Sequence, residues 1–269
     1  MFTLNNASTF QHNEIDEALD LFESVLASHK DKYGDIHHLV GSATHNIGLV
    51  QLFAERYGPA MDSFQEALAV RRAALGMEHP DVAASMMSIG MIQLVHRESE
   101  QARDTFLRVL VLLRRVLGYG HIQVARVLNN LAVALYDMGA YLDAFRTFQQ
   151  AHEIQRRLYV LSQAENTTIL NQTRIIELAL ANTLNNLGFM YCRQKKYADS
   201  LRMLEEASKM RRRHLGEHHP LIVNGEENLR YVRGKVPKNE PGNAQNLKKK
   251  ENTLDLLCGA AGNASRQTM

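Results

Sequence analysis

Amide side chains recur along this sequence at a constant interval, and they are its best candidates for binding chemistry. Asn46, Ser88 and Asn130 are spaced by 42 residues, and Asn186 and Asn228 repeat that step after one longer interval of 56 residues. The amide of asparagine offers two donors and an acceptor in one plane. It can therefore hold the backbone of an extended peptide without requiring a particular side-chain sequence.

Other polar residues flank this series at helical spacing. Asn129 and Asn185 stand one position before an asparagine of the series, and Arg126 and Asn182 stand four positions before one. Residues three or four positions apart share one face of a helix. The predicted binding face consists of Asn46, Ser88, Arg126, Asn129, Asn130, Asn182, Asn185, Asn186 and Asn228. Arg126 is the clearest cation for an acidic ligand.

The asparagines have an alternative role, in which they bond only to the neighbouring repeat and fix how the repeats stack. A hydrogen bond contributes about 1 kcal/mol net, whereas micromolar affinity requires about 8 kcal/mol. Asparagines alone are therefore insufficient for tight binding. We expect apolar pockets to contribute the remainder, lined by Leu49, Met91, Val133 and Phe189.

Residues suited to catalysis or metal binding are scattered. His214, His218 and His219 cluster, but Gly216 interrupts them, so the helical spacing of zinc proteases is lost. Cys192 has no adjacent base, and no glycine-rich loop that would cradle phosphate is present. We therefore predict a protein that is not an enzyme and has no catalytic residue, cofactor or metal.

Composition limits the partners. Residues 234–269 carry six basic and three acidic residues, and the remaining chain carries 25 basic and 26 acidic residues. This near-neutral body argues against nucleic-acid binding, which needs a strongly basic face. The apolar runs are too short for a membrane span, and the N-terminus lacks a signal core. We expect a cytoplasmic protein that binds a protein or peptide, with no nucleic acid and no membrane span.

The same 42-residue step defines the elements that position these residues. Alanines recur at Ala18, Ala60, Ala102 and Ala144, and phenylalanines recur at Phe22, Phe64, Phe106 and Phe148. An interval of this size indicates a repeat array. Residues 80–118 predict two helices, separated by a polar break at 96–99 and closed by Gly118. Each helix pair must stack on its neighbours to bury its apolar faces.

These residues resemble a known family. A small residue, an alanine and a phenylalanine at offsets of 12 and 16 resemble the tetratricopeptide repeat. The 42-residue period, the His-Pro pairs at 79–80 and 219–220, and the Leu-Asn-Asn-Leu motifs at 128–131 and 184–187 resemble the longer repeat of kinesin light chains and nephrocystin-type proteins. The resemblance implies an all-α tetratricopeptide-repeat α-solenoid, a right-handed superhelix of antiparallel helix pairs. It also implies a groove, lined by the first helices, in which the asparagines hold ligand backbone or carboxylate.

The register divides the chain into segments. We predict an array over residues 1–233 and a disordered tail over residues 234–269. The array comprises a partial first repeat at 1–38, repeats at about 39–80, 81–122, 123–178 and 179–220, and a capping helix at 221–233. In the partial repeat, a shortened first helix near Leu4 precedes a helix from Ile15 to Tyr33. In the tail, Lys248–Lys250 is a solvated run or a nuclear signal, and the leucines at 254, 256 and 257 form a short helix or docking segment.

Two further features have alternative interpretations. The interval of 56 residues places a 14-residue insertion within 159–176, which is either a surface loop or an extension of both helices by about two turns each. Arginine pairs recur at 71–72, 114–115, 156–157 and 211–212. They either complement the carboxyl ends of second helices or form a basic ridge for an acidic partner.

Together these patterns predict an interaction module or adaptor that binds a peptide or partner protein in the groove of the repeats. The alternatives are a structural scaffold or oligomerisation element that uses the repeat edges, and one piece of a larger regulatory or enzymatic system. The resemblance adds a kinesin-type cargo adaptor subunit, with a motor or cytoskeletal link.

Overall fold

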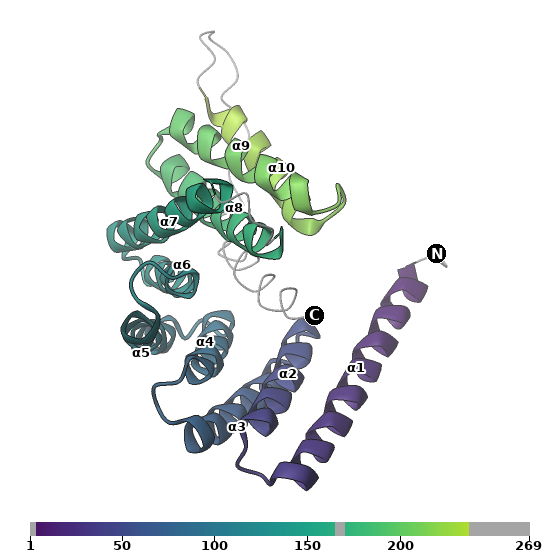
Figure 1. Ribbon diagram of the computed structural model, residues 1–269. Helices are drawn as coiled ribbons and strands as arrows, with labels where there is room; N and C mark the ends of the chain where they lie inside the picture. The colour runs from purple at the N-terminus through teal and green to yellow at the C-terminus, as the bar shows by residue number, and fades with distance from the viewer. Residues whose placement is uncertain (1–3, 165–169, 237–269) are drawn as a thin grey trace. The chain divides into compact units, whose positions relative to one another are not determined.

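The computed structural model describes residues 4–164 and 170–236, which contain ten helices and no strand (Figure 1). Their bounds are α1 Leu4–Tyr33, α2 His38–Phe53, α3 Tyr57–Leu75, α4 Pro80–Val95, α5 Ser99–Leu117, α6 Ile122–Asp137, α7 Tyr141–Ala164, α8 Leu170–Arg193, α9 Tyr197–His214 and α10 Pro220–Lys235. The predicted all-α class is confirmed. The predicted disordered tail, apart from its first three residues, lies outside the described residues.

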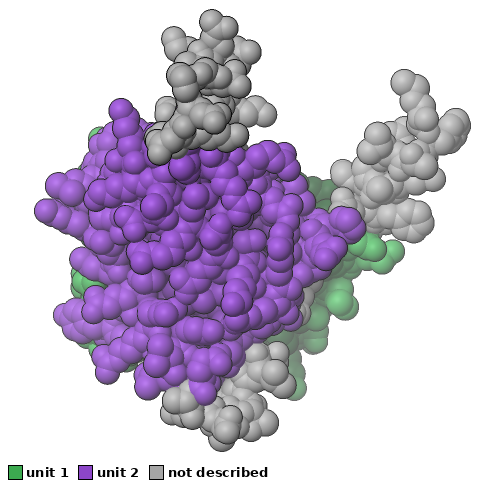
Figure 2. Space-filling view, turned by 90° about the horizontal axis from the view of Figure 1, so that it is seen from above, with its two compact units in different colours: residues 1–118, 263–269 green, residues 119–262 purple. Residues whose placement is uncertain are grey.

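The chain forms two compact units, which Figure 2 colours separately. Among the described residues, unit 1 runs to Gly118 and contains α1 to α5, and unit 2 begins at Tyr119 and contains α6 to α10. In unit 1, α2 packs on α3 and α4 packs on α5, while α1 covers α2. In unit 2, α6 pairs with α7, α8 pairs with α9, and α10 packs on α9. Each unit therefore contains two complete helix pairs and one additional helix.

A close approach of helices forms the centre of each pair. The phenylalanines Phe64, Phe106 and Phe148 have no exposed surface. A Cβ atom added to Gly90 would lie 2.6 Å from the ring of Phe106, and one added to Gly48 would lie 2.8 Å from the ring of Phe64. The mid-helix glycines are thus explained by packing, because a larger side chain would collide with the buried ring.

Histidines begin four of the first helices. His37, His79, His121 and His219 each accept a hydrogen bond from the backbone N–H two residues later, at 3.1 to 3.3 Å. These bonds satisfy amide donors that have no partner inside the helix. The register accounts for the position of each cap, since 37, 79 and 121 are one step apart.

The connections between repeats and within pairs use left-handed backbone. Gly76 and Gly118 end α3 and α5 at φ +82°, a conformation that glycine adopts without strain. Inside the pairs, Glu55, Arg97 and Lys195 adopt φ of 59° to 63° at equivalent positions, where the third pair has Gly139. The polar break predicted after residue 95 is therefore a tight three-residue turn.

The insertion lengthens the second helix of one pair and the first helix of the next. Helices α7 and α8 each contain 24 residues, whereas the other paired helices contain 16 to 19. Tyr159 of α7 packs against the core formed by α8 and α9, which includes Leu184 and Met210. Among the described residues, the interpretation of the insertion as an extension of two helices is confirmed. Residues 165–169 lie outside the described residues.

The first repeat differs from its prediction. Helix α1 runs without interruption from Leu4 to Tyr33, so the separate shortened first helix near Leu4 was wrong. Residues 4–33 contain neither glycine nor proline, and nothing in them ends a helix before Ile15. Ile15, Leu19 and Phe22 of α1 pack against Ile47 and Val50 of α2, which places the predicted second helix correctly.

Candidate binding face of the first helices

The first helices of the pairs, together with α10, carry every residue of the predicted binding face. In unit 1, α2 carries Asn46, which is half-buried, and α4 carries Ser88, which is buried. In unit 2, α6 carries Arg126, Asn129 and Asn130. The remaining residues lie on α8 and α10: Asn182, Asn185, Asn186 and Asn228. The two units present their faces separately, so each is considered by itself.

Several asparagines of unit 2 bond to a neighbouring helix. Asn182 of α8 accepts a hydrogen bond from Arg211 of α9 at 2.8 Å. Asn185 of α8 accepts one from the amide of Asn228 on α10 at 3.3 Å. These contacts support the alternative role in which such residues fix the stacking of repeats.

Asn129 belongs to the same group. Its amide nitrogen donates to the hydroxyl of Thr183 on α8 at 2.6 Å, and that hydroxyl donates to Gln155 of α7 at 2.6 Å. Thr183 and Gln155 have no exposed surface. The chain of hydrogen bonds therefore links α6, α7 and α8 inside unit 2.

Three asparagines of the 42-residue series behave differently, whereas the fourth, Asn228, bonds to Asn185. Asn46, Asn130 and Asn186 make no side-chain hydrogen bond to any described residue. Asn130 is 6% exposed and Asn186 is 4% exposed. No amide nitrogen or oxygen of either residue is both fully buried and without a hydrogen-bond partner. Their amides therefore keep a small contact with the surface and make no side-chain hydrogen bond within the described part of the chain.

Arg126 stands one turn before Asn130 on α6. It is half-buried, and burial lowers the pKa of its guanidinium below the usual range. Among the described residues, no carboxylate forms an ion pair with it. A cation withdrawn from water is unfavourable unless an anion or hydrogen-bond acceptor compensates it.

The predicted apolar pockets are mostly core. Leu49, Met91 and Val133 are buried, with at most 9% of their surface exposed. Phe189 remains half-buried, and its ring meets that of Tyr136 edge to face with centroids 5.7 Å apart. Arg193 donates a hydrogen bond to the Tyr136 hydroxyl and stacks over the ring of Tyr141. Of the four predicted residues, Phe189 alone contributes an accessible aromatic surface.

The arginine pairs have a role that neither sequence interpretation included. Arg71 of α3 donates to the carbonyl of Asp81 at 3.0 Å and to the hydroxyl of Ser85 at 2.9 Å. Arg211 donates to the carbonyl of Leu221 at 3.0 Å. Each arginine is buried and bonds ten residues ahead, to the first turn of the next helix. Residues 71 and 211 are 140 residues apart, which equals three steps of 42 residues plus the 14-residue insertion. The sequence register therefore already indicated that these two arginines are equivalent.

Two second members of the pairs form exposed ion pairs: Arg212 pairs with Glu226, and Arg115 pairs with Glu78. Arg156, the first member of its pair, contacts Glu206 at 2.7 Å. Exposed pairs of this kind contribute little to stability.

Glu177 of α8 was not identified from the sequence. Its side chain is 4% exposed, contacts Arg213 at 2.9 Å and bonds to His214. Glu177 occupies the register position of the capping histidines, but α8 continues past it, so no cap is needed there. His219 caps α10, and the described residues contain no group of three or more side chains arranged to hold a metal ion.

Cys192 lies at the end of α8. It is half-buried beside Leu204, Leu229 and Val232, and burial raises the pKa of its thiol. A raised pKa leaves the thiol protonated and weakly nucleophilic. Across residues 4–164 and 170–236, no helix combines the length and apolar character that crossing a bilayer requires.

Comparison with known structures gives the same fold. BtubC (BKLC) from P. vanneervenii aligns with a TM-score of 0.58 at 14% identity, covering 88% of this chain and 99% of that one. A putative kinesin light chain from Podosopora anserina, with nearly identical TPR-like repeats, aligns at 0.53 and 14% identity over 82% of this chain and 93% of that one. A second structure of that protein aligns at 0.52 and 15% identity, over 72% and 85% of the two chains. At these identities the likeness establishes the fold, an α-solenoid of tetratricopeptide repeats.

Family comparison covers most of the repeats. One model described as tetratricopeptide repeat matches residues 3–73 and 81–157, and another of the same description matches residues 180–221. The search of curated proteins returned no match. Because the first model alone spans more than half of the sequence, the chain belongs to the tetratricopeptide-repeat family.

Proposed function

We propose that the chain is a protein-interaction module, in which the face of α6 and α8 in unit 2 binds an extended segment of a partner protein. Asn130 and Asn186 hold the backbone of that segment, and Arg126 pairs with an acidic group on it. Tetratricopeptide repeats are generally protein-interaction modules, which supports the coarse role. The proposal gives the chain no reaction of its own.

One observation carries the proposal. Three of the asparagines beside the series, Asn129, Asn182 and Asn185, are occupied by bonds between helices, whereas Asn130 and Asn186 are not. The amides of Asn130 and Asn186 therefore make none of the hydrogen bonds that join the helices. The bond between Asn129 and Thr183 joins α6 to α8 next to Asn130, which supports placing both amides in one site.

Arg126 supports an acidic character for the partner. Its guanidinium is partly desolvated and has no carboxylate among the described residues. A carboxylate from a partner would compensate that cost and form a charge-assisted hydrogen bond. Phe189 adds an aromatic edge on α8, three residues after Asn186, against which an apolar side chain can pack.

A cargo-adaptor role in a motor complex is a narrower form of this proposal. It rests on the likeness in fold to structures whose titles name kinesin light chains. The alternative of a scaffold that uses the repeat edges makes no use of Asn130 or Asn186, so the same experiment separates the two roles.

The test replaces the two asparagines. Partners are first identified by proximity labelling, and the affinity of one purified partner segment is then measured for the wild-type chain and for Asn130→Ala/Asn186→Ala. Losing two hydrogen bonds of about 1 kcal/mol each weakens binding by about thirtyfold. The matched control is Gln149→Ala/Gln150→Ala, which removes two exposed amides from α7. Equal affinity of wild type and the asparagine variant would overturn the proposal and favour the repeat edges.

A further inference from the structure

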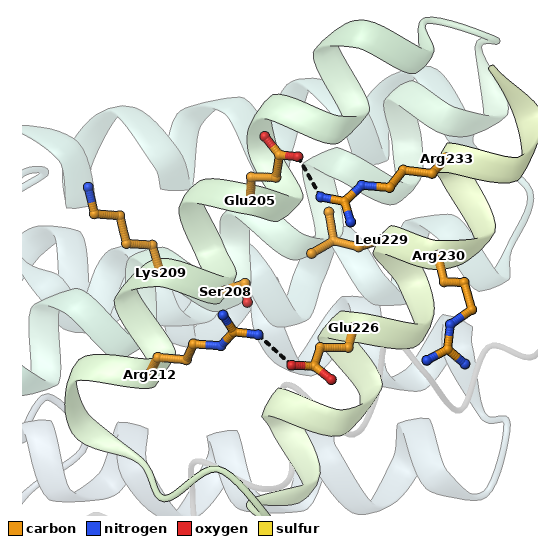
Figure 3. Close-up of a pocket in the computed structure, with 8 residues that line it drawn as sticks. All are labelled: Glu205, Ser208, Lys209, Arg212, Glu226, Leu229, Arg230 and Arg233. Atoms are coloured by element: carbon orange, nitrogen blue, oxygen red, sulfur yellow. Dashed lines mark hydrogen bonds and ion pairs between the residues drawn. The ribbon is translucent and has the colours of Figure 1, made fainter. Parts of the chain in front are cut away.

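The end of unit 2 contains an open cleft between α9 and α10, with a volume of about 560 Å³ (Figure 3). The lining from α9 is Glu205, Ser208, Lys209 and Arg212, and the lining from α10 is Glu226, Leu229, Arg230 and Arg233. The cleft is separate from the face of Asn130 and Asn186. Its inference therefore does not depend on the proposed function.

The charges of the cleft do not balance. Arg233 pairs with Glu205 at 2.9 Å, and Arg212 pairs with Glu226. Lys209 and Arg230 have no carboxylate partner among the described residues, and Figure 3 shows both side chains directed away from the two ion pairs. The cleft thus has two positive charges without an ion-pair partner, beside Leu229, which is 8% exposed and packs with Leu204 and Val232.

The register shows what this cleft replaces. Arg230 occupies the position of Gly48, Gly90 and Gly188, the glycines against which a second helix packs in earlier pairs. Arg233 occupies the position of Gln51 and Gln93, which accept hydrogen bonds from second helices at 2.8 and 2.9 Å. A second helix would therefore pack at this place, but Arg230 excludes a helix of the usual kind, because the earlier pairs have only glycine or alanine at its position.

The sequence after α10 contains one segment whose chemistry fits. Residues 251–258 read Glu-Asn-Thr-Leu-Asp-Leu-Leu-Cys, in which two carboxylates match the two unpaired cations and leucines match Leu229. Lys248–Lys250 precede it and are repelled by the cleft, which limits the docking segment to residues from Glu251 onward. Fifteen residues separate Lys235 from Glu251. That length of chain is sufficient to span the distance from the end of α10 back to the cleft, because Arg233 of the cleft lies two residues before Lys235.

We propose that the cleft between α9 and α10 binds the chain's own segment 251–258. Glu251 and Asp255 pair with Lys209 and Arg230, and the leucines cover Leu229. Tethering raises the effective concentration of the segment to the millimolar range. Weak contacts are therefore sufficient for occupancy, and added salt weakens them by screening the ion pairs.

Backbone hydrogen exchange of the full chain tests this proposal at low salt. Amides of residues 251–258 are expected to exchange about tenfold more slowly than in the free peptide of the same sequence. Lys209→Glu/Arg230→Glu abolishes that protection, and so does Glu251→Lys/Asp255→Lys. Combining the two double substitutions restores it, because the ion pairs form again with opposite polarity.

The matched control is Arg157→Glu/Lys195→Glu, which changes the net charge equally at exposed positions of unit 2. Lys195→Glu is compatible with the backbone, since Glu55 occupies the equivalent left-handed position in unit 1. The control is expected to retain protection. Exchange at the free-peptide rate in the wild type would overturn the proposal, as would equal protection in Lys209→Glu/Arg230→Glu. Protection that falls on dilution would place the contact between two copies and overturn the intrachain assignment.

Discussion

At the scale of single residues, the register identifies positions but not the partners of the side chains there. Position 45 and its equivalents hold His45, Met87, Asn129 and Asn185. His45 is buried against the ring of Phe64, with ring centroids 5.0 Å apart, and its imidazole lies 3.5 Å from the hydroxyl of Ser85. The neighbouring Arg71 adds positive charge. A histidine in this environment is stable only in its neutral form.

Acidification is therefore expected to destabilise unit 1 through His45. Burial, and then the charge of Arg71, lowers the pKa of His45 from 6.5 to about 3. The unfolded chain binds this proton below about pH 6.5 and the folded chain does not, so stability present at neutral pH is lost as the pH falls toward 3. Between pH 7 and pH 5 the loss is about 2 kcal/mol.

Urea unfolding at both pH values checks this expectation. His45→Met, which introduces the residue found at position 87, removes a titrating group and is expected to show a smaller loss by about 2 kcal/mol. If wild type and variant lose the same free energy of unfolding between pH 7 and pH 5, His45 does not contribute to the acid sensitivity.

At the scale of helices and helix pairs, much was predictable from the sequence. The paired helices, the glycine–phenylalanine contacts and the closing glycines follow from patterns within one repeat. The bonds of Arg71 and Arg211 and the burial of Glu177 were not predictable, because they depend on which group of an adjacent helix faces each side chain. The error in α1 has the opposite cause: a motif near Leu4 suggested a separate helix where no residue ends one.

The close contact of α4 with α5 gives a prediction at this scale. Gly90→Ala is expected to destabilise the fold by about 1–3 kcal/mol, because the added methyl group lies 2.6 Å from the buried ring of Phe106. The pair of α6 and α7 accommodates the methyl group of Ala132 at this position, opposite Phe148. The two helices of a pair can therefore move apart, at some cost in stability. The urea midpoint measures the change.

Gly58→Ala is the control for this prediction. It introduces the same methyl group near the start of α3, where nothing lies within 4 Å. Alanine is the better helix former, so Gly58→Ala is expected to leave stability unchanged or raise it. Equal midpoints for the two variants would show that the approach at Gly90 is not tight.

At the scale of the whole molecule, the chain divides into two compact units. Repeat proteins gain stability from each repeat and from its interfaces with its immediate neighbours. A core substitution is therefore expected to act mainly within its own unit. The sequence indicated the repeats but not this division, because the same residue types recur in both units.

Gly188→Ala tests that expectation. The added Cβ atom lies 2.7 Å from the side chain of Leu204, so the pair of α8 and α9 in unit 2 is expected to loosen. Hydrogen exchange of α8 and α9 amides increases severalfold, while that of α2 and α3 amides in unit 1 stays within about twofold of the wild type. An equal increase in both units would indicate one cooperative structure.

The lengthened helices α7 and α8 have a consequence for how such chains vary. Helix α7 is five residues longer than α3 and α5, and α8 is eight residues longer than α2, α4 and α6. The additional residues lie at the end of α7 and at the start of α8, so the register resumes after them and Asn186 keeps the position that Asn130 has in its repeat. Insertions and deletions at this place therefore leave the repeat positions on either side unchanged. A lineage can change the length of these two helices without disturbing the spacing of the amides.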